Sequence, residues 1–310
     1  MATAIPPLKV SEKLEFGDPK QHSIATQSSS KLVVASYNIR YAVGRFLISS
    51  GLLRKLGISG HRKRVHQVGE NIRQVSEILN AAKLMPLPDV VALQEADKET
   101  VRAGGHHVAR ELAEALEVSW VHAPAGIPRG QPPVARQWWL DFEEQIGLHD
   151  TGDTGVALLS RYPLEDVTRI DLPWHECPWR PRLAMAATIS LGNNSLRILN
   201  AHVDPHAAIG GQLEQLEVLA AEAEKHSGAT LVLGDFNTLS KRKCSETRAF
   251  MEARGFQTPI PTGTPTWRGA GIRLHADWIF YRDLKITNWG VARPLNVSDH
   301  WPIWAELVFE

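Results

Sequence analysis

Short apolar runs that end at Gly, Pro, Asn or Asp recur along this chain, and this pattern limits its fold more than any other feature. Apolar runs of about four to eight residues between turn-forming residues are typical of buried β-strands. Clear examples occupy residues 32–39, 89–94, 155–160, 196–203, 230–236, 275–281 and 301–309.

Helical patterns separate some of these runs. Residues 64–84, 106–117 and 210–226 place apolar side chains at the spacing of an amphipathic helix. Strands mixed with helices predict an α/β sandwich. The sequence shows no internal repeat and no long linker, so we expect one domain over residues 31–310. The polar residues 1–30 are expected to form a poorly ordered tail.

The charge balance argues against a generally basic protein. Lys and Arg number 34, and so do Asp and Glu, which gives a formal net charge of zero. Nonspecific nucleic-acid binders draw affinity from an excess of basic residues, so any contact with a polyanion must be local here. The two cysteines, Cys177 and Cys244, are too few for a disulfide framework and lack zinc-site spacing.

The first residues of the chain do not resemble a targeting signal. Met1–Val10 holds two prolines and lacks a basic stretch followed by an apolar run. No run of about 18 uncharged apolar residues occurs, so we expect no membrane-spanning helix. These features favour a cytoplasmic protein and leave the oligomeric state open.

Polar side chains follow or end almost every predicted strand. Ligands gather at strand ends in layered α/β folds, because loops converge there while the sheet holds them rigid. A single Asn or Asp after a strand is commonly a turn former, whereas eight such positions indicate a functional site. They are Asn38, Glu95, His202, Asp235, Asn237, Asp277, Asp299 and His300.

At these positions the sequence resembles the endonuclease/exonuclease/phosphatase superfamily, which has the DNase I-like fold. The resemblance covers about residues 31–310, and the order of the motifs makes it specific, since each motif alone is weak. The motifs are YN at 37–38, LQE at 93–95, GVALLSRYP at 155–163, NAH at 200–202, GDFN at 234–237, ADWIF at 276–280 and SDH at 298–300.

The resemblance implies a four-layer α/β sandwich, in which two packed mixed β-sheets are flanked by helices. It also implies a divalent-metal-dependent phosphoesterase. Glu95 is then the main ligand for Mg²⁺, or alternatively Mn²⁺, with Asn38 beside it and Asp299 as a second or water-mediated contact. Hard cations prefer oxygen ligands, and the lack of a Cys/His cluster agrees with this choice.

Catalytic roles are likewise implied by the resemblance. Asp277 orients His300, which activates water or holds the phosphate, and Asp235 acts as the base for the attacking water. Asn237 donates to the developing negative charge. His202 donates to the phosphoryl group or protonates the leaving oxygen. The sequence does not decide whether His202 or His300 is the general acid.

Two further positions bear on the substrate. Arg182 begins a strand that resembles the family's arginine-leading strand, so it is a candidate phosphate contact, with an exposed surface arginine as the alternative. His202 resembles the DNase I and sphingomyelinase branches, whereas the abasic-site repair branch carries Tyr there. The family often has Asn at the position of Val156, which we interpret as structural.

A basic segment directly follows Asn38. Residues 45–66 interleave basic and apolar side chains, and no acidic residue occurs between positions 38 and 69. The segment is predicted to contact nucleic-acid phosphates or anionic lipid headgroups, or it is a solvated loop. The Lys and Arg residues between positions 38 and 69 are Arg40, Arg45, Arg54, Lys55, Arg62, Lys63 and Arg64.

The main hypothesis is hydrolysis of a phosphodiester or phosphomonoester by in-line attack of water. The substrate is a nucleic acid, a phospholipid or sphingomyelin, or a small phosphorylated metabolite. A non-catalytic binding module with the same fold is the alternative from another class, although none of the motif positions is lost. A serine hydrolase is disfavoured because no G-x-S-x-G element exists.

Overall fold

The computed structural model describes residues 13–18, 31–44, 61–129, 146–173, 181–269 and 271–309, without the side chains of residues 61–63. The predicted contact segment at residues 45–66 therefore lies almost entirely outside the described residues. Among the described helices, none is long and apolar enough to cross a membrane.

Seven described strands form the larger sheet, and its only parallel pair is β2 with β3. A helix between two parallel strands is the ordinary crossover connection, and α2 (His61–Ala81) provides it here. Across the sheet the strands are β1 (Glu15–Gly17), β4 (Ser119–Pro124), β5 (Gly155–Ser160), β3 (Val90–Gln94), β2 (Lys31–Asn38), β14 (Ile303–Phe309) and β13 (Leu284–Val291).

Five described strands form the smaller sheet, which repeats this plan with the parallel pair β8 and β9. The crossover helix is α4 (Ile209–Glu224). In spatial order the strands are β12 (Asp277–Arg282), β9 (Ala229–Asp235), β8 (Asn194–His202), β7 (Arg182–Leu191) and β6 (Glu165–Leu172). A separate hairpin joins β10 (Trp267–Gly269) and β11 (Ile272–Leu274).

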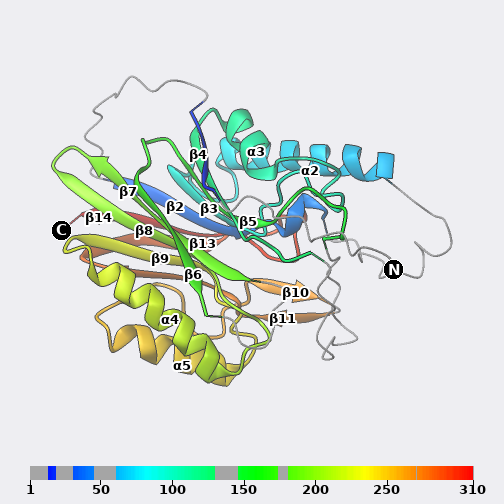
Figure 1. Cartoon of the computed structure of the whole chain (residues 1–310). Coiled ribbons are helices and arrows are strands. Elements are labelled where there is room, and N and C mark those ends of the chain that lie inside the picture. The colour runs from blue at the N-terminus through cyan, green and yellow to red at the C-terminus, as the bar shows by residue number, and fades with distance from the viewer. Residues whose placement is uncertain are drawn as a thin grey trace.

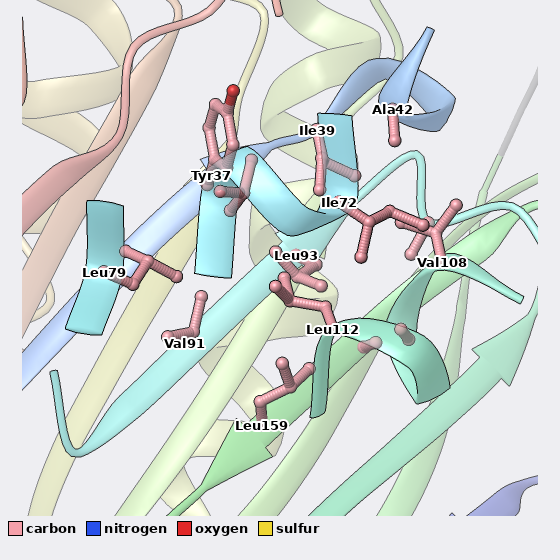
Figure 2. Packing of buried hydrophobic residues seen from close by; sticks show 14 of the residues in the cluster. Tyr37, Ile39, Ala42, Ile72, Leu79, Val91, Leu93, Val108, Leu112 and Leu159 are labelled. Carbon is pink, nitrogen blue, oxygen red and sulfur yellow. The ribbon is translucent and has the colours of Figure 1, made fainter. Parts of the chain in front are cut away.

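The elements stack in four layers, which confirms the predicted sandwich (Figure 1). Helices α2 and α3 (Val108–Leu116) cover the outer face of the larger sheet, and Figure 2 shows Ile72, Leu79 and Leu112 packed over Val91 and Leu93. Helices α4 and α5 (Lys241–Glu252) cover the smaller sheet. A third apolar core fills the space between the sheets.

A buried polar network also joins the two sheets. Gln94 at the end of β3 donates to Asn200 Oδ1 in β8 at 2.7 Å, and both side chains are fully buried. The Asn200 amide in turn donates to the carbonyl oxygens of Leu93 at 2.9 Å and Ala157 at 2.8 Å. Such a network aligns facing strands, because sliding either sheet leaves buried polar groups unpaired. Gln94 directly precedes Glu95 in the sequence, and Asn200 lies two residues before His202.

The predicted strands and helices are confirmed with small shifts at their ends. The sequence pattern did not predict α5, whose exposed face is charged, or β4, β6, β13 and the hairpin β10–β11. Strands β6 and β13 lie at sheet edges and alternate exposed with half-buried residues, so they lack the continuous apolar runs that marked the others.

Residues 15–17 lie in the predicted tail but form strand β1, which pairs with β4 and corrects that part of the prediction. Glu15 contacts Lys98 and accepts from His107 Nε2 at 3.1 Å. The His107 Nδ1 atom accepts the Arg110 N–H, so Nε2 carries the ring proton. Glu15, His107 and His122 lie close enough to hold an ion, but the Nε2 proton of His107 is used in its hydrogen bond to Glu15, and His122 Nε2 pairs with the Ala96 carbonyl oxygen.

We predict that Asn200→Ala destabilises the protein by about 2–4 kcal/mol, because it removes three buried hydrogen bonds, one from Gln94 and two to the carbonyl oxygens of Leu93 and Ala157. The midpoint of thermal unfolding is expected to fall by about 5–10 °C. The control is Asn194→Ala, at an exposed position of the same strand. A shift below about 2 °C for Asn200→Ala, measured by calorimetry, would contradict the structural role of the network.

Candidate active site

The predicted site residues meet where the two parallel strand pairs end. Asn38 ends β2 and Asp235 ends β9, and the Asn38 amide donates to Asp235 Oδ2 at 2.9 Å. His202 ends β8 directly beside Asp235, and Asp277 begins β12 on its other side. The hydrogen bonds from Asn38 to Asp235 and from Gln94 to Asn200 place the carboxyl ends of all four central strands at one edge of the sandwich.

Asp235 lies at the centre of this group and is 1% exposed. Its Oδ2 atom is 3.6 Å from His202 Nε2 and 3.7 Å from His300 Nε2. Its Oδ1 atom accepts the Asn237 N–H at 2.9 Å. Burial raises the pKa of Asp235 to about 7, against the opposing effect of His300. A carboxylate with this pKa is suited to accept a proton near neutral pH.

His300 and Asp277 form the predicted pair. His300 Nδ1 lies 2.9 Å from Asp277 Oδ2 and 3.1 Å from Oδ1, and both residues are buried. Burial alone lowers the pKa of His300, but the carboxylates of Asp277 and Asp235 outweigh it and raise the pKa to about 10. His300 is therefore a cation at neutral pH, and the Asp277 hydrogen bond fixes the orientation of its ring.

Arg182 is buried rather than exposed, with 3% of its surface accessible. Its Nη1 atom lies 3.1 Å from the ring nitrogens of His202. Its Nε and Nη2 atoms are buried and have no hydrogen-bond partner among the residues that the structure describes. A buried guanidinium with unsatisfied donors is unfavourable by itself. Its planar fork matches the oxygens of a phosphate, which would satisfy these donors.

Glu95 occupies a strained backbone position next to this group. Its φ of 52° lies in the left-handed region, which costs a residue with a β-carbon about 1–3 kcal/mol. Its carbonyl oxygen accepts the Tyr41 N–H at 3.0 Å, and its Oε1 atom is 3.8 Å from His202 Nε2. Behind it, buried Arg102 binds Asp97 Oδ2 at 2.6 Å, and its pKa is raised because Asp97, Tyr41 and Glu95 outweigh burial.

Asp299 is joined to the group through the turn after β2. Asn38 Oδ1 accepts the Arg40 N–H at 3.0 Å, and the Arg40 guanidinium lies 3.6 Å from Asp299 Oδ2. Trp267 donates to the same carboxylate oxygen at 3.1 Å. Ser298 donates to the Asn38 carbonyl oxygen at 2.8 Å, which links the SDH segment to the end of β2. Ser298 also donates to Asp299 Oδ1 at 3.2 Å, so the Asp299 carboxylate already has three partners.

The Asn237 side chain is partly used in holding the loop after β9. Its amide donates to the Val203 carbonyl oxygen at 2.9 Å. Its φ of 50° is tolerated better by Asn than by most residues. One amide hydrogen is left for another acceptor.

The donor set fits a hard divalent cation. Carboxylates and a carboxamide converge here with no cysteine among the described site residues, as Mg²⁺ and Mn²⁺ require. The tightest group of ligand atoms differs from the predicted set, since Asp235, Asp277 and His300 lie within 4.8 Å of one another. Glu95 reaches the group through His202, and Asn38 reaches it through Asp235.

Several supporting residues were not identified as site residues by sequence reasoning. Arg40 and Arg102 contact or face the predicted metal ligands, and Trp267 binds Asp299. The position of Arg40, two residues after Asn38, was a usable signal. Arg102 pairs with an acid five residues earlier, and sequence spacing alone does not reveal that it turns inward.

Comparisons with known proteins agree with this arrangement. The endonuclease/exonuclease/phosphatase family matches residues 35–300. A UPF0294 protein of Photorhabdus laumondii subsp. laumondii is 28% identical over 141 residues, which are 42% of this chain and 53% of that protein. The chain therefore spans about half the length of this curated relative.

Solved structures share the fold at low sequence identity. An endonuclease/exonuclease/phosphatase from Beutenbergia cavernae has a TM-score of 0.62 and 15% identity, covering 90% of this chain and 72% of that chain. ANGEL2, a 2',3'-cyclic phosphatase solved with adenosine-2',3'-vanadate, has a TM-score of 0.57 and 14% identity, covering 96% and 99%. Since the family match covers most of the sequence, the chain belongs to the endonuclease/exonuclease/phosphatase family.

Proposed function

We propose that the protein is a divalent-metal-dependent phosphoesterase that hydrolyses a phosphodiester or phosphomonoester by in-line attack of water. The observation that carries the proposal is the buried Arg182, whose unpaired donors lie beside His202 in the same group as Asp235 and His300. An anion-binding cation, a carboxylate of raised pKa and a charged histidine are the groups that phosphate-ester hydrolysis needs.

The proposed metal ligands are Glu95 and Asn38, with Asp299 in direct or water-mediated contact. The Tyr41 N–H, which donates to the Glu95 carbonyl oxygen, helps to hold Glu95 in its strained backbone conformation. A bound Mg²⁺ or Mn²⁺ neutralises charge on the phosphate and on the leaving oxygen.

The other residues bind the phosphate and transfer protons. Arg182 holds the non-bridging oxygens through its two unpaired nitrogens. Asp235 accepts the proton of the attacking water, and the His300 imidazolium, oriented by Asp277, stabilises the charge that develops on the phosphoryl group. His202 donates to the phosphoryl group or protonates the leaving oxygen. The free amide hydrogen of Asn237 supports the same negative charge.

The substrate class is kept open between a nucleic acid, a phospholipid or sphingomyelin, and a small metabolite. ANGEL2 is a 2',3'-cyclic phosphatase, so 2',3'-cyclic nucleotides join the substrates to be compared. The panel also holds plasmid DNA, single-stranded RNA, sphingomyelin, phosphoinositides and bis-p-nitrophenyl phosphate. Each is assayed with Mg²⁺ or Mn²⁺ and with excess EDTA.

We predict that Glu95→Gln lowers kcat/KM for bis-p-nitrophenyl phosphate by about 100-fold or more, because the amide keeps the shape but removes the charge that binds the cation. EDTA is expected to abolish the wild-type activity. The matched control is Glu99→Gln, an exposed position four residues later that is expected to behave as wild type. Hydrolysis that survives both the Glu95→Gln substitution and chelation by EDTA would contradict metal catalysis and the proposed metal ligands.

We further predict a bell-shaped pH profile of kcat/KM. Asp235 works as the carboxylate, so activity is lost as the pH falls through about 7, where burial has placed its pKa. His300 works as the imidazolium, so activity is lost as the pH rises through about 10. Because Asp235 and His300 interact, the two apparent pKa values of the profile describe the pair together.

The measurement is the hydrolysis of bis-p-nitrophenyl phosphate from about pH 5 to 11. His300→Gln is expected to lower the rate and remove the alkaline limb, while it keeps the acidic one. A maximum near pH 5 would contradict a role for ionised Asp235 as the base.

A further inference from the structure

Three arginines surround the indole ring of Trp301, next in sequence to His300. The guanidinium carbons of Arg268 and Arg293 each lie 4.6 Å from the ring centroid, and that of Arg273 lies 6.0 Å away. The indole is buried, whereas Arg273 and Arg293 are exposed. The ring face attracts cations and so holds positive charge at the surface. We call Trp301 and these arginines the arginine cluster.

Backbone pairing connects the cluster to the proposed active site. The Arg268 N–H donates to the Asp299 carbonyl oxygen at 2.8 Å, and the Trp301 N–H donates to Thr266 at 2.8 Å. Trp267, the neighbour of Arg268 in β10, binds the Asp299 carboxylate at 3.1 Å. The cluster therefore flanks the segment that carries Asp299 and His300, and the hairpin β10–β11 supplies two of its arginines (Figure 1).

The exposed arginines of the cluster are not neutralised by acids. No carboxylate of the described residues lies within 4.0 Å of the guanidinium nitrogens of Arg273 or Arg293. Arg293 donates to the carbonyl oxygen of Pro265, which carries no charge. Partial burial and the positive charge of the neighbouring Arg273 both lower the pKa of Arg293.

Such a group favours an anion over water. Guanidinium groups bind phosphate oxygens through paired hydrogen bonds, and an anion between two cations relieves their repulsion. Most exposed arginines are merely solvated, and many elsewhere in this chain pair with a glutamate one helical turn away, as Arg242 and Arg248 do. Arg273 and Arg293 instead have no carboxylate partner among the described residues, and they lie beside the proposed phosphate-ester site.

We propose that the arginine cluster binds a second phosphate of the substrate, one that is not cleaved. The inference rests on the proposed function, because it places the scissile phosphate at Arg182, His202 and His300. It implies a substrate with at least two phosphates. A nucleotide chain and a polyphosphorylated headgroup both supply this chemistry.

The test compares Arg273→Ala/Arg293→Ala with Arg242→Ala/Arg248→Ala, which removes the same charge from helix α5. Binding is measured in EDTA, where no hydrolysis occurs, by the anisotropy of a short fluorescein-labelled single-stranded oligonucleotide. Inositol hexakisphosphate is titrated separately by calorimetry. Thermal unfolding confirms that each variant is folded.

The cluster variant is expected to weaken binding by about tenfold or more, while the control pair changes it less than about threefold. The slope of log K against log salt should become shallower by about 0.7 for each lost oligonucleotide phosphate contact. If the cluster variant loses binding to just one of the two probes, that probe identifies the source of the second phosphate, a nucleotide chain or a polyphosphorylated headgroup. Equal binding by both variants, or no binding of either probe to the wild-type protein, overturns the inference.

The proposed function is judged separately, by wild-type hydrolysis of bis-p-nitrophenyl phosphate, which has a single phosphate. A protein that binds the probes through the cluster but hydrolyses no ester would contradict the proposed function and leave the subsite supported. A protein that hydrolyses the ester but binds no probe would support the proposed function and contradict the second phosphate site.

Discussion

The hydrogen bond from Asn38 to Asp235 joins the two sheets at the point where their central strands end, and the rest of the site depends on it. It holds a buried carboxylate within 4 Å of two histidines that come from different strands and loops. The hydrogen bond between Gln94 and Asn200, from the neighbouring strands β3 and β8, also joins the two sheets. The fold thus positions the chemistry by fixing the offset between two sheets.

This arrangement opposes stability at several positions. Asp235 has a raised pKa because it is buried, Arg182 has unsatisfied donors, and Glu95 occupies the left-handed region. Each of these features is unfavourable in the protein alone, and in the proposed mechanism a bound phosphate would satisfy the donors of Arg182. Strain and unpaired charge concentrated in one place are typical of functional sites. The three apolar cores supply the stability that this requires.

Most of the fold could be predicted from the sequence because it depends on local pattern, and the candidate site residues lie together at the strand ends, as the sequence indicated. Buried strands such as β2 and β9 are continuous apolar runs, and the polar residues that end them mark one edge of the sheets. The His300–Asp277 pair was predicted as a pair and is present. Edge strands such as β6 were missed, since their solvent-facing residues dilute the apolar signal.

What could not be predicted depends on contacts between distant segments. The burial of Arg182, the interlock of Gln94 with Asn200 and the partners of Asp299 all come from residues far apart in the chain. Residues 15–17 carry too short a strand to be recognised without its partner β4. The arginine cluster is likewise assembled from three separate stretches of the chain. The net charge of zero gives no indication that positive charge is concentrated there.

The central claim is that side chains from both sheets converge on one divalent cation at this edge. Anomalous diffraction from crystals soaked in Mn²⁺ tests it most directly, because the signal locates the ion independently of any activity. The account predicts a single strong peak in contact with the Glu95 carboxylate and beside Asn38, and it predicts that the peak disappears in crystals of Glu95→Gln. A peak bound only at Glu15 and His107, or no peak at the strand ends under saturating Mn²⁺, would contradict it.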